Sequence, residues 1–200
     1  SFGDAAAFSF FANKIITCGE GGAVMFRNEI SYEKAKLLRD HGMSKNKRYW
    51  HEEVGYNYRL TNIQAAIGCA QLEQLESFTI RRKKIFDIYD EILISTGLFK
   101  RQLIKKGNIE GYWLYTVFIE KEINVELLME KLSKSGIDTR PVFYPMNQMP
   151  AFSTINNKTN FSHSTNISSH GITLPSSVSL EIDEIKFICD RLLKIINEIA

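Results

Sequence analysis

A single lysine near the start of the chain stands in an unusual setting. Lys14 lies in the stretch FSFFANKIITCGEGG (residues 8–22), between an aromatic run and a cluster of glycines, and it has no basic neighbour within ten residues. Apolar surroundings disfavour the charged ammonium and make the neutral, nucleophilic amine accessible. Such an amine can form a Schiff base with a carbonyl compound. Composition alone favours the simpler interpretation, a loop lysine between two strands.

A second stretch that could carry chemistry is the polar and aromatic segment of residues 43–59. Its donors and rings are Lys45, Lys47, Arg48, Tyr49, Trp50, His51, Tyr56, Asn57, Tyr58 and Arg59. This mixture is typical of a loop that faces a ligand or another subunit. The glycines of GEGG lack the spacing of a dinucleotide fingerprint, and no histidine pair has metal-ligand spacing, so no metal site is predicted.

Four stretches, taken in order, resemble one family. SFGDAAAFSFFANKIITCGEGG, GYNYRLTNIQAAIGCAQLEQLE, TRPVFYP and LPSSVSL look like the C-terminal half of the DegT/DnrJ/EryC1/StrS sugar aminotransferases, which depend on pyridoxal 5'-phosphate. The resemblance runs over nearly all of the 200 residues. Within the family, RDHGMSKNKRYWHEEVGYNYR and TRPVFYP look closest to the GDP-perosamine synthases.

The resemblance implies cofactor contacts for three residues. Lys14 matches the Schiff-base lysine, which in the family also moves the proton between the amino-bearing carbon and the cofactor. Ser9 matches a serine that donates to the cofactor phosphate. Asn57 matches an asparagine that reaches the phosphate from the neighbouring subunit, so a homodimer is expected.

Three further residues are candidates for substrate binding. Arg59 could pair with a carboxylate of the amino donor or with a nucleotide phosphate, and it could equally be a structural arginine. By resemblance, Arg140 and Tyr144 lie where the family's sugar-nucleotide site closes. Asn147 stands where many members have histidine, which leaves the identity of the substrate open.

The fold class implied is α/β, the C-terminal part of a fold-type-I aminotransferase with the end of its large domain and a small α+β domain. The expected reaction moves an amino group from glutamate to a nucleotide-linked 4-keto-6-deoxysugar. One alternative is a deoxysugar dehydratase of the same family, but those typically replace the lysine by histidine. Another is a non-catalytic assembly module. The chain begins without methionine inside a motif, so we expect a fragment that is inactive alone.

The composition of the chain indicates which classes of partner and which cellular compartment to expect. A chain with 44% hydrophobic residues can bury a sizeable core, and 25 basic against 23 acidic residues leave a formal charge of only +2. Neither a nucleic acid nor a membrane partner is expected. Three widely spaced cysteines match no disulfide framework, and we expect reduced thiols in a cytoplasmic protein.

The pattern of apolar residues predicts the elements of the first half. Residues 5–10 and 22–27 are predicted as two buried strands, and residues 31–41 as a helix that ends at Gly42. A long helix begins at Thr61 and continues to about residue 95, with a bend at Gly68 or within residues 76–79. It joins a large-domain portion (residues 1–75) to a small domain (residues 76–200).

The second half is predicted as a mixed domain. Residues 113–119 form a central strand, residues 124–135 a helix and residues 137–140 a returning strand, which together make a βαβ-like unit. Residues 153–171 are predicted as a loop that can include one short helix. A final amphipathic helix over residues 181–199 packs on the sheet.

Overall fold

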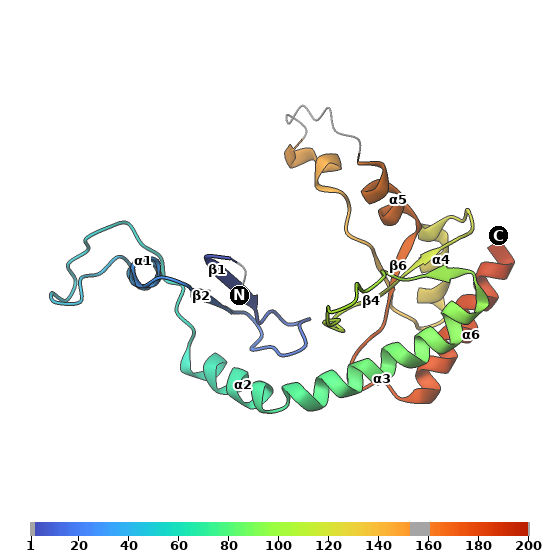
Figure 1. Ribbon diagram of the computed structural model, residues 1–200, viewed down its shortest axis with the longest axis horizontal. Coiled ribbons are helices and arrows are strands. Elements are labelled where there is room, and N and C mark those ends of the chain that lie inside the picture. The colour runs from blue at the N-terminus through green and yellow to red at the C-terminus, as the bar shows by residue number, and fades with distance from the viewer. Residues whose placement is uncertain (1–2, 153–160, 200) are drawn as a thin grey trace. The chain divides into compact units, whose positions relative to one another are not determined.

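The structure is a computed structural model that describes residues 3–152 and 161–199 (Figure 1). The chain divides into two compact units, Ser1–Ser77 and Phe78–Ala200. Each unit is described by itself below. The expected assignment of residues 1–75 to a large domain and 76–200 to a small one stays a prediction.

The first unit begins with a β-hairpin. Strands β1 (Ala5–Ser9) and β2 (Gly22–Phe26) pair antiparallel, from Ala5 opposite Phe26 to Ser9 opposite Gly22. The two predicted strands are therefore present, but the prediction that they are buried is wrong. Their side chains are exposed, apart from the half-buried Phe26. The sheet has only two strands in the described part of the chain, so its apolar faces lack the covering layers of a larger sheet.

Helix α1 (Glu29–Arg39) follows β2 directly. It begins earlier than predicted because Asn28, rather than Ser31, caps it, and the Asn28 side-chain oxygen accepts a hydrogen bond from Ser31 N at 2.8 Å. Asp40 closes the helix and Gly42 follows with a positive φ of 63°. Residues 43–60 then form an irregular segment, as predicted for residues 43–59.

The predicted long helix is two helices, α2 (Asn62–Glu73) and α3 (Leu75–Leu93). Thr61 caps α2 as predicted, in a capping box with Gln64. The interruption lies at Gln74, so both predicted bend positions are wrong. The Ser77 hydroxyl donates to Gln74 O at 2.8 Å and thereby competes with the helical hydrogen-bond ladder.

The second unit is built on a four-stranded antiparallel sheet with the order β3-β4-β6-β5. Its strands are β3 (Phe99–Lys100), β4 (Tyr115–Ile119), β5 (Arg140–Pro141) and β6 (Gly171–Leu174). The central place of β4 was predicted. β6 was not predicted, and it lies between β4 and β5, so the βαβ-like unit is split by a strand from later in the chain.

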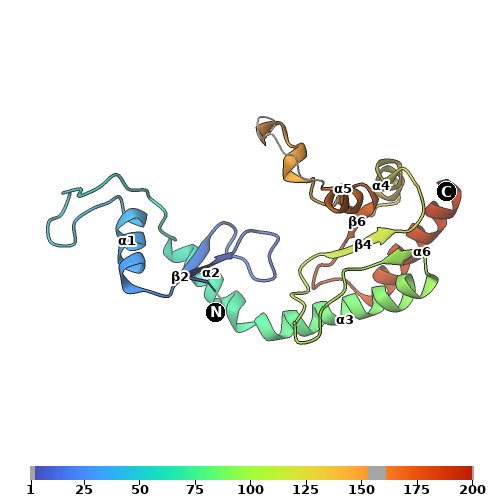
Figure 2. The same ribbon diagram turned by 45° about the horizontal axis from the view of Figure 1, so that its top comes forward.

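Helices complete this unit around the sheet (Figures 1 and 2). α4 (Val125–Lys134) is capped by Asn124 as predicted, α5 (Ser162–His170) is the short helix allowed in the predicted loop, and α6 (Ile182–Ile199) is the final amphipathic helix. Residues 153–160 of that loop lie outside the described residues. Short 3₁₀ turns occupy Ile94–Thr96, Met146–Gln148 and Pro150–Phe152.

The hydrophobic core of the second unit joins α3, α4 and α6 to the sheet. Its fully buried members include Tyr89, Leu128, Ile172 and Leu192. β4 alternates buried and half-buried side chains, whereas all four residues of β6 are buried. The sheet is therefore well covered along β6.

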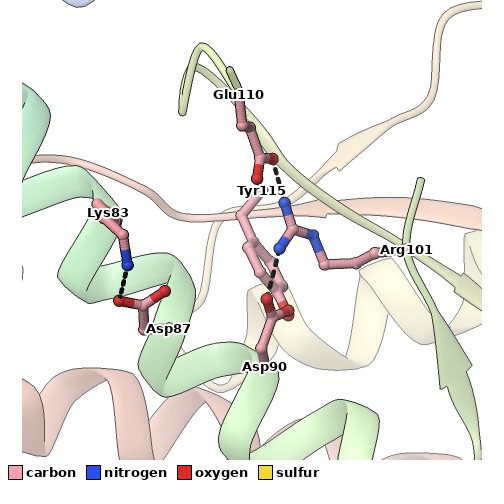
Figure 3. A network of polar contacts seen from close by, with 6 residues as sticks. All are labelled: Lys83, Asp87, Asp90, Arg101, Glu110 and Tyr115. Carbon is pink, nitrogen blue, oxygen red and sulfur yellow. Dashed lines mark hydrogen bonds and ion pairs between the residues drawn. The ribbon is translucent and has the colours of Figure 1, made fainter. Parts of the chain in front are cut away.

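A polar network fastens the segment after β3 to this core (Figure 3). The Arg101 guanidinium donates to Asp90 of α3 at 2.5 Å and also pairs with Glu110. It lies over the ring of Tyr115, 4.9 Å from the centroid, and the Tyr115 hydroxyl donates to the same aspartate at 2.8 Å. One arginine thus holds residues 101 and 110 of a long connection against the helix.

Candidate functional site

The hairpin loop that carries Lys14 is held by backbone hydrogen bonds at its base. Phe10 N donates to Gly21 O at 2.9 Å, and Cys18 N donates to Phe10 O at 3.1 Å. Within the loop, Lys14 N donates to Phe11 O at 3.0 Å, which makes a tight turn immediately before the lysine side chain. Lys14 is half-buried. The loop therefore presents one lysine from a fixed backbone at the end of a strand pair.

Gly21 shows how little room the loop leaves. Its φ is 151°, and a Cβ there would lie 2.8 Å from Cys18 Sγ and 2.8 Å from Leu60 Cδ2. Cys18 is buried, and its thiol donates to Glu20 O at 3.2 Å. The GEGG stretch thus follows a close backbone path that a side chain at residue 21 would obstruct.

Ser9 is the last residue of β1, at the edge of the same loop. Its hydroxyl oxygen accepts a hydrogen bond from Phe11 N at 3.3 Å. An accepting hydroxyl still has its own proton to donate. Ser9 can therefore offer a neutral donor to an anion beside the Lys14 loop.

Asn57 and Arg59 belong to a different cluster, at the C-terminal end of α1. Arg59 Nη1 lies 3.1 Å from Asp40 Oδ1, and Arg59 Nε donates to Asn57 Oδ1 at 3.3 Å. Arg59 Nη2 lies 3.5 Å from His41 Nε2. Sequence reasoning did not single out Asp40, and it placed His41 only beside the loop expected to face a ligand. The signal available was their position in RDHG, inside a stretch already noted for its resemblance.

A pocket of about 870 Å³ lies in the first unit between α1, β2 and the segment that leads into α2. Arg59 is among its lining residues, whereas Ser9, Lys14 and Asn57 are not. Much of the wall is apolar or aromatic. The lining includes Val24, Phe26, Tyr32, Leu38, Tyr56, Tyr58 and Leu60. The pocket and the predicted cofactor contacts are therefore different surfaces of this unit.

Arg140 and Tyr144 belong to the second unit. Arg140 pairs with Thr173 in the sheet and is exposed, and Tyr144 is 60% exposed. Both side chains are thus accessible within their own unit. Their approach to a ligand held by Lys14 stays a prediction.

Residues 3–152 and 161–199 contain no group of three or more histidine, cysteine or acidic side chains able to hold a metal ion. Within the same residues, every helix is too short or too polar to cross a bilayer.

The donors described above fit the needs of pyridoxal phosphate. That cofactor requires an amine for its aldehyde and hydrogen-bond donors for its phosphate. Lys14 supplies the amine, and Ser9, at the edge of the same loop, keeps its hydroxyl proton to donate. In Asn57 the oxygen is taken by Arg59, which leaves the amide nitrogen to donate. The chemistry of this donor set suits a phosphate dianion.

The fold has close counterparts among solved structures. The aminotransferase PseC of Helicobacter pylori, described as involved in the biosynthesis of pseudoaminic acid, superposes with a TM-score of 0.90 and is 28% identical. The match covers 98% of this chain and 54% of that chain. The fold is the C-terminal part of a fold-type-I aminotransferase, comprising the end of the large domain and the small α+β domain.

Sequence comparison identifies the family. Residues 1–193 match the DegT/DnrJ/EryC1/StrS aminotransferase family. The GDP-perosamine synthase of Vibrio cholerae is 39% identical over 98% of this chain and 54% of its own length. The protein named "Putative pyridoxal phosphate-dependent aminotransferase EpsN" of Bacillus subtilis is 29% identical over all of this chain and 52% of its own length.

The chain belongs to the DegT/DnrJ/EryC1/StrS aminotransferase family. It spans about half the length of the curated relatives it matches. The resemblance noted from the sequence motifs is therefore confirmed, including its closeness to GDP-perosamine synthases.

Proposed function

We propose that the complete protein transfers an amino group from glutamate to the 4-keto group of a GDP-linked 6-deoxysugar. The observation that carries the proposal is the Lys14 loop, a single lysine presented from a fixed turn beside a serine donor in a chain of this family. Similarity to the GDP-perosamine synthase of V. cholerae favours this class of acceptor.

Lys14 would hold pyridoxal phosphate through its side-chain nitrogen. The bound cofactor withdraws electrons from the amino-bearing carbon of the donor, so that the proton on that carbon becomes acidic. Lys14 Nζ would act as the base that accepts this proton and then as the acid that releases it to the cofactor. A half-buried lysine in a tight loop can serve both as nucleophile and as proton carrier, because the fixed backbone keeps its side-chain nitrogen near the same position in both roles.

Ser9 and Asn57 would bind the cofactor phosphate by donating hydrogen bonds to it. Asn57 would reach it from the second subunit of a homodimer. Arg140 and Tyr144 would close on the sugar nucleotide, with the guanidinium facing its diphosphate. The dehydratase alternative is less favoured because Lys14 is retained where those enzymes typically have histidine.

We further propose that residues 1–200 alone bind the cofactor weakly and transfer no amino group. Both faces of the β1-β2 pair are exposed, so this piece lacks the packed sheet that would keep a cofactor loop rigid.

The experiment that tests the proposed function compares kcat/KM of the complete enzyme for GDP-, dTDP- and UDP-linked 4-keto-6-deoxysugars, with glutamate as donor. The proposal predicts amino transfer with the highest kcat/KM for the GDP sugar. A preference for dTDP or UDP would make the acceptor a 4-keto sugar linked to that nucleotide, and dehydration without amino transfer would support the alternative.

A further inference from the structure

The contacts of Arg59 bear on whether it binds an anionic ligand or is a structural arginine. Three of its nitrogens each face a different side chain: Nη1 faces Asp40 at 3.1 Å, Nε faces Asn57 at 3.3 Å, and Nη2 faces His41 at 3.5 Å. An arginine used in this way is already committed inside its own unit. It is poorly placed to act as the main receptor of a second anion.

The charge of Arg59 is also matched locally. Asp40 Oδ1 is shielded from solvent and accepts no well-aligned hydrogen bond from the described residues, so the guanidinium 3.1 Å away compensates its charge. Removing the arginine would leave that carboxylate without a cation beside it. The pair therefore holds the guanidinium plane in place against the end of α1.

The backbone beneath Asn57 is fixed on both sides. Tyr56 N donates to Leu38 O at 2.7 Å, and Tyr58 N donates to Arg39 O at 3.0 Å. Asp40 and Asn57 face each other in an antiparallel bridge. With the main chain held in this way, the remaining freedom of Asn57 is the rotation of its side chain.

The hydrogen bond from Arg59 fixes the orientation of the Asn57 side-chain amide. A guanidinium has donors and no acceptor, so the Asn57 atom that faces Arg59 Nε has to be the amide oxygen. The amide nitrogen consequently points away from Arg59, with both hydrogens available to donate. An unrestrained amide could instead present its oxygen, which repels an anion.

We propose that Arg59 is a positioning residue: held by Asp40, it orients the Asn57 amide so that its nitrogen donates to the cofactor phosphate. The inference rests on the proposed role of Asn57 in phosphate binding. It assigns Arg59 no direct contact with the amino donor or the sugar nucleotide.

The test uses the complete dimeric enzyme and two probes, pyridoxal phosphate and pyridoxal, which lacks the phosphate. Dissociation constants for both are measured by absorbance titration for wild type, Asn57→Ala, Arg59→Lys and the double variant. Loss of a hydrogen bond to a charged group corresponds to roughly 10- to 100-fold in affinity. Asn57→Ala is expected to weaken the affinity for pyridoxal phosphate by about this factor and to leave the affinity for pyridoxal unchanged.

Arg59→Lys keeps the charge but loses the planar fork. We expect it to weaken pyridoxal phosphate binding almost as much as Asn57→Ala, to spare pyridoxal, and to add nothing in the double variant. KM for glutamate and for the sugar nucleotide at saturating cofactor should not change. An additive double variant, or a raised KM with unchanged cofactor affinity, would overturn the positioning role.

Two outcomes distinguish a failure of the positioning role of Arg59 from a failure of the proposed phosphate contact of Asn57. If Asn57→Ala leaves pyridoxal phosphate binding unchanged, the proposed phosphate contact of Asn57 fails and the positioning role falls with it. If Asn57→Ala weakens it but Arg59→Lys does not, the phosphate contact stands and only the positioning role is wrong. Equal weakening of both probes by Arg59→Lys would indicate a general disturbance of the fold and would also overturn it.

Discussion

Gly42 and Gly55 approach each other so closely that a Cβ on Gly55 would lie 2.2 Å from Gly42 N. The same Cβ would lie 2.5 Å from the carbonyl carbon of His41. This contact closes the loop of residues 43–54, the first part of the irregular segment, just before Asn57 and Arg59. The segment's position thus depends on a backbone approach that only glycine permits.

We therefore predict that Gly55→Ala displaces this segment. The expected result is a loss of about 1–3 kcal/mol in unfolding free energy, typical of forced overpacking, together with weaker binding of pyridoxal phosphate. Gly111→Ala is the matched control, since a Cβ there meets nothing within 4 Å and its backbone needs no positive φ. Urea unfolding and cofactor titration of the complete protein measure both effects. Equal behaviour of the two variants would contradict the prediction.

The second prediction concerns the Arg101 network (Figure 3). The Arg101 side chain is only 16% exposed and pairs with both Asp90 and Glu110. Arg101→Met would leave two partly buried carboxylates without their cation, and we expect a loss of about 1–3 kcal/mol in unfolding free energy. The loss is reduced from that of a fully buried pair because the acids keep some contact with water.

Lys83→Met is the control for this prediction, because Lys83 lies in α3, the helix that carries Asp90 (Figure 3). Lys83 and Asp87 form an exposed pair one helical turn apart. Such pairs contribute about 0.3–0.5 kcal/mol, so the control should be nearly neutral. If urea unfolding shows Arg101→Met to be as mild as Lys83→Met, the network does not stabilise the unit.

A third prediction follows from Cys189 on α6. This side chain is fully buried, and burial raises the pKa of its thiol to about 12. In the unfolded chain the thiol ionises at a pH of about 8.5, so between about pH 9 and 12 the unfolded state binds fewer protons than the folded state. Unfolding free energy should therefore fall as pH rises, by up to about 1.4 kcal/mol per pH unit from this thiol.

The measurement is urea unfolding of the complete protein at pH 8, 9 and 10. Cys189→Ala should have a shallower decline over this range, because the variant has no thiol to ionise. Burial also raises the pKa of Tyr89 and Tyr115, whose contribution becomes important above about pH 10. A variant with the same slope as the wild type between pH 8 and 10 would refute the linkage to Cys189.

The fourth prediction is that each active site is shared between two subunits. Asn57→Ala and Lys14→Ala proteins, both complete and each inactive or weakened alone, are mixed and allowed to exchange subunits. If Asn57 acts across the interface, one site of each mixed dimer carries both lesions and the other site is intact. Activity should then recover toward half of the wild-type value per mixed dimer. Absence of recovery, with exchange verified by mass, would show that Asn57 acts within its own chain.

Local signals in the sequence predicted many of the elements. Thr61 and Asn124 have the side chains that cap helices, and both cap the helices expected of them. The apolar stripe of α6 is buried as its spacing predicted. These features depend on residues a few positions apart, which is why a single sequence reveals them.

Other features depend on parts of the chain that are distant in sequence. β6 has only four residues, and its place between β4 and β5 is set by pairing across the sheet. The exposed faces of β1 and β2 could not be foreseen, because an apolar run indicates burial only where a covering layer exists. The break lies at Gln74, whose carbonyl accepts a hydrogen bond from the Ser77 hydroxyl, and the spacing of apolar residues carries no signal of it.

The candidate site divides in the same way. Lys14 and Ser9 were found from one short motif and its resemblance, and the structure places them in and beside one hairpin loop. The roles of Asp40 and His41 depend on contacts with Arg59, about twenty positions later. Sequence motifs therefore gave the residues that we propose hold the cofactor, while the contacts that we propose orient Asn57 required the structure.

The central claim is that Lys14 holds the cofactor. The most direct measurement is reduction of the complete protein with borohydride in the presence of pyridoxal phosphate, followed by proteolysis and mass spectrometry of the peptides. The account predicts one pyridoxyl group per chain, on the peptide that contains Lys14, and none in Lys14→Arg. Labelling of any other lysine, or undiminished labelling of Lys14→Arg, would contradict it.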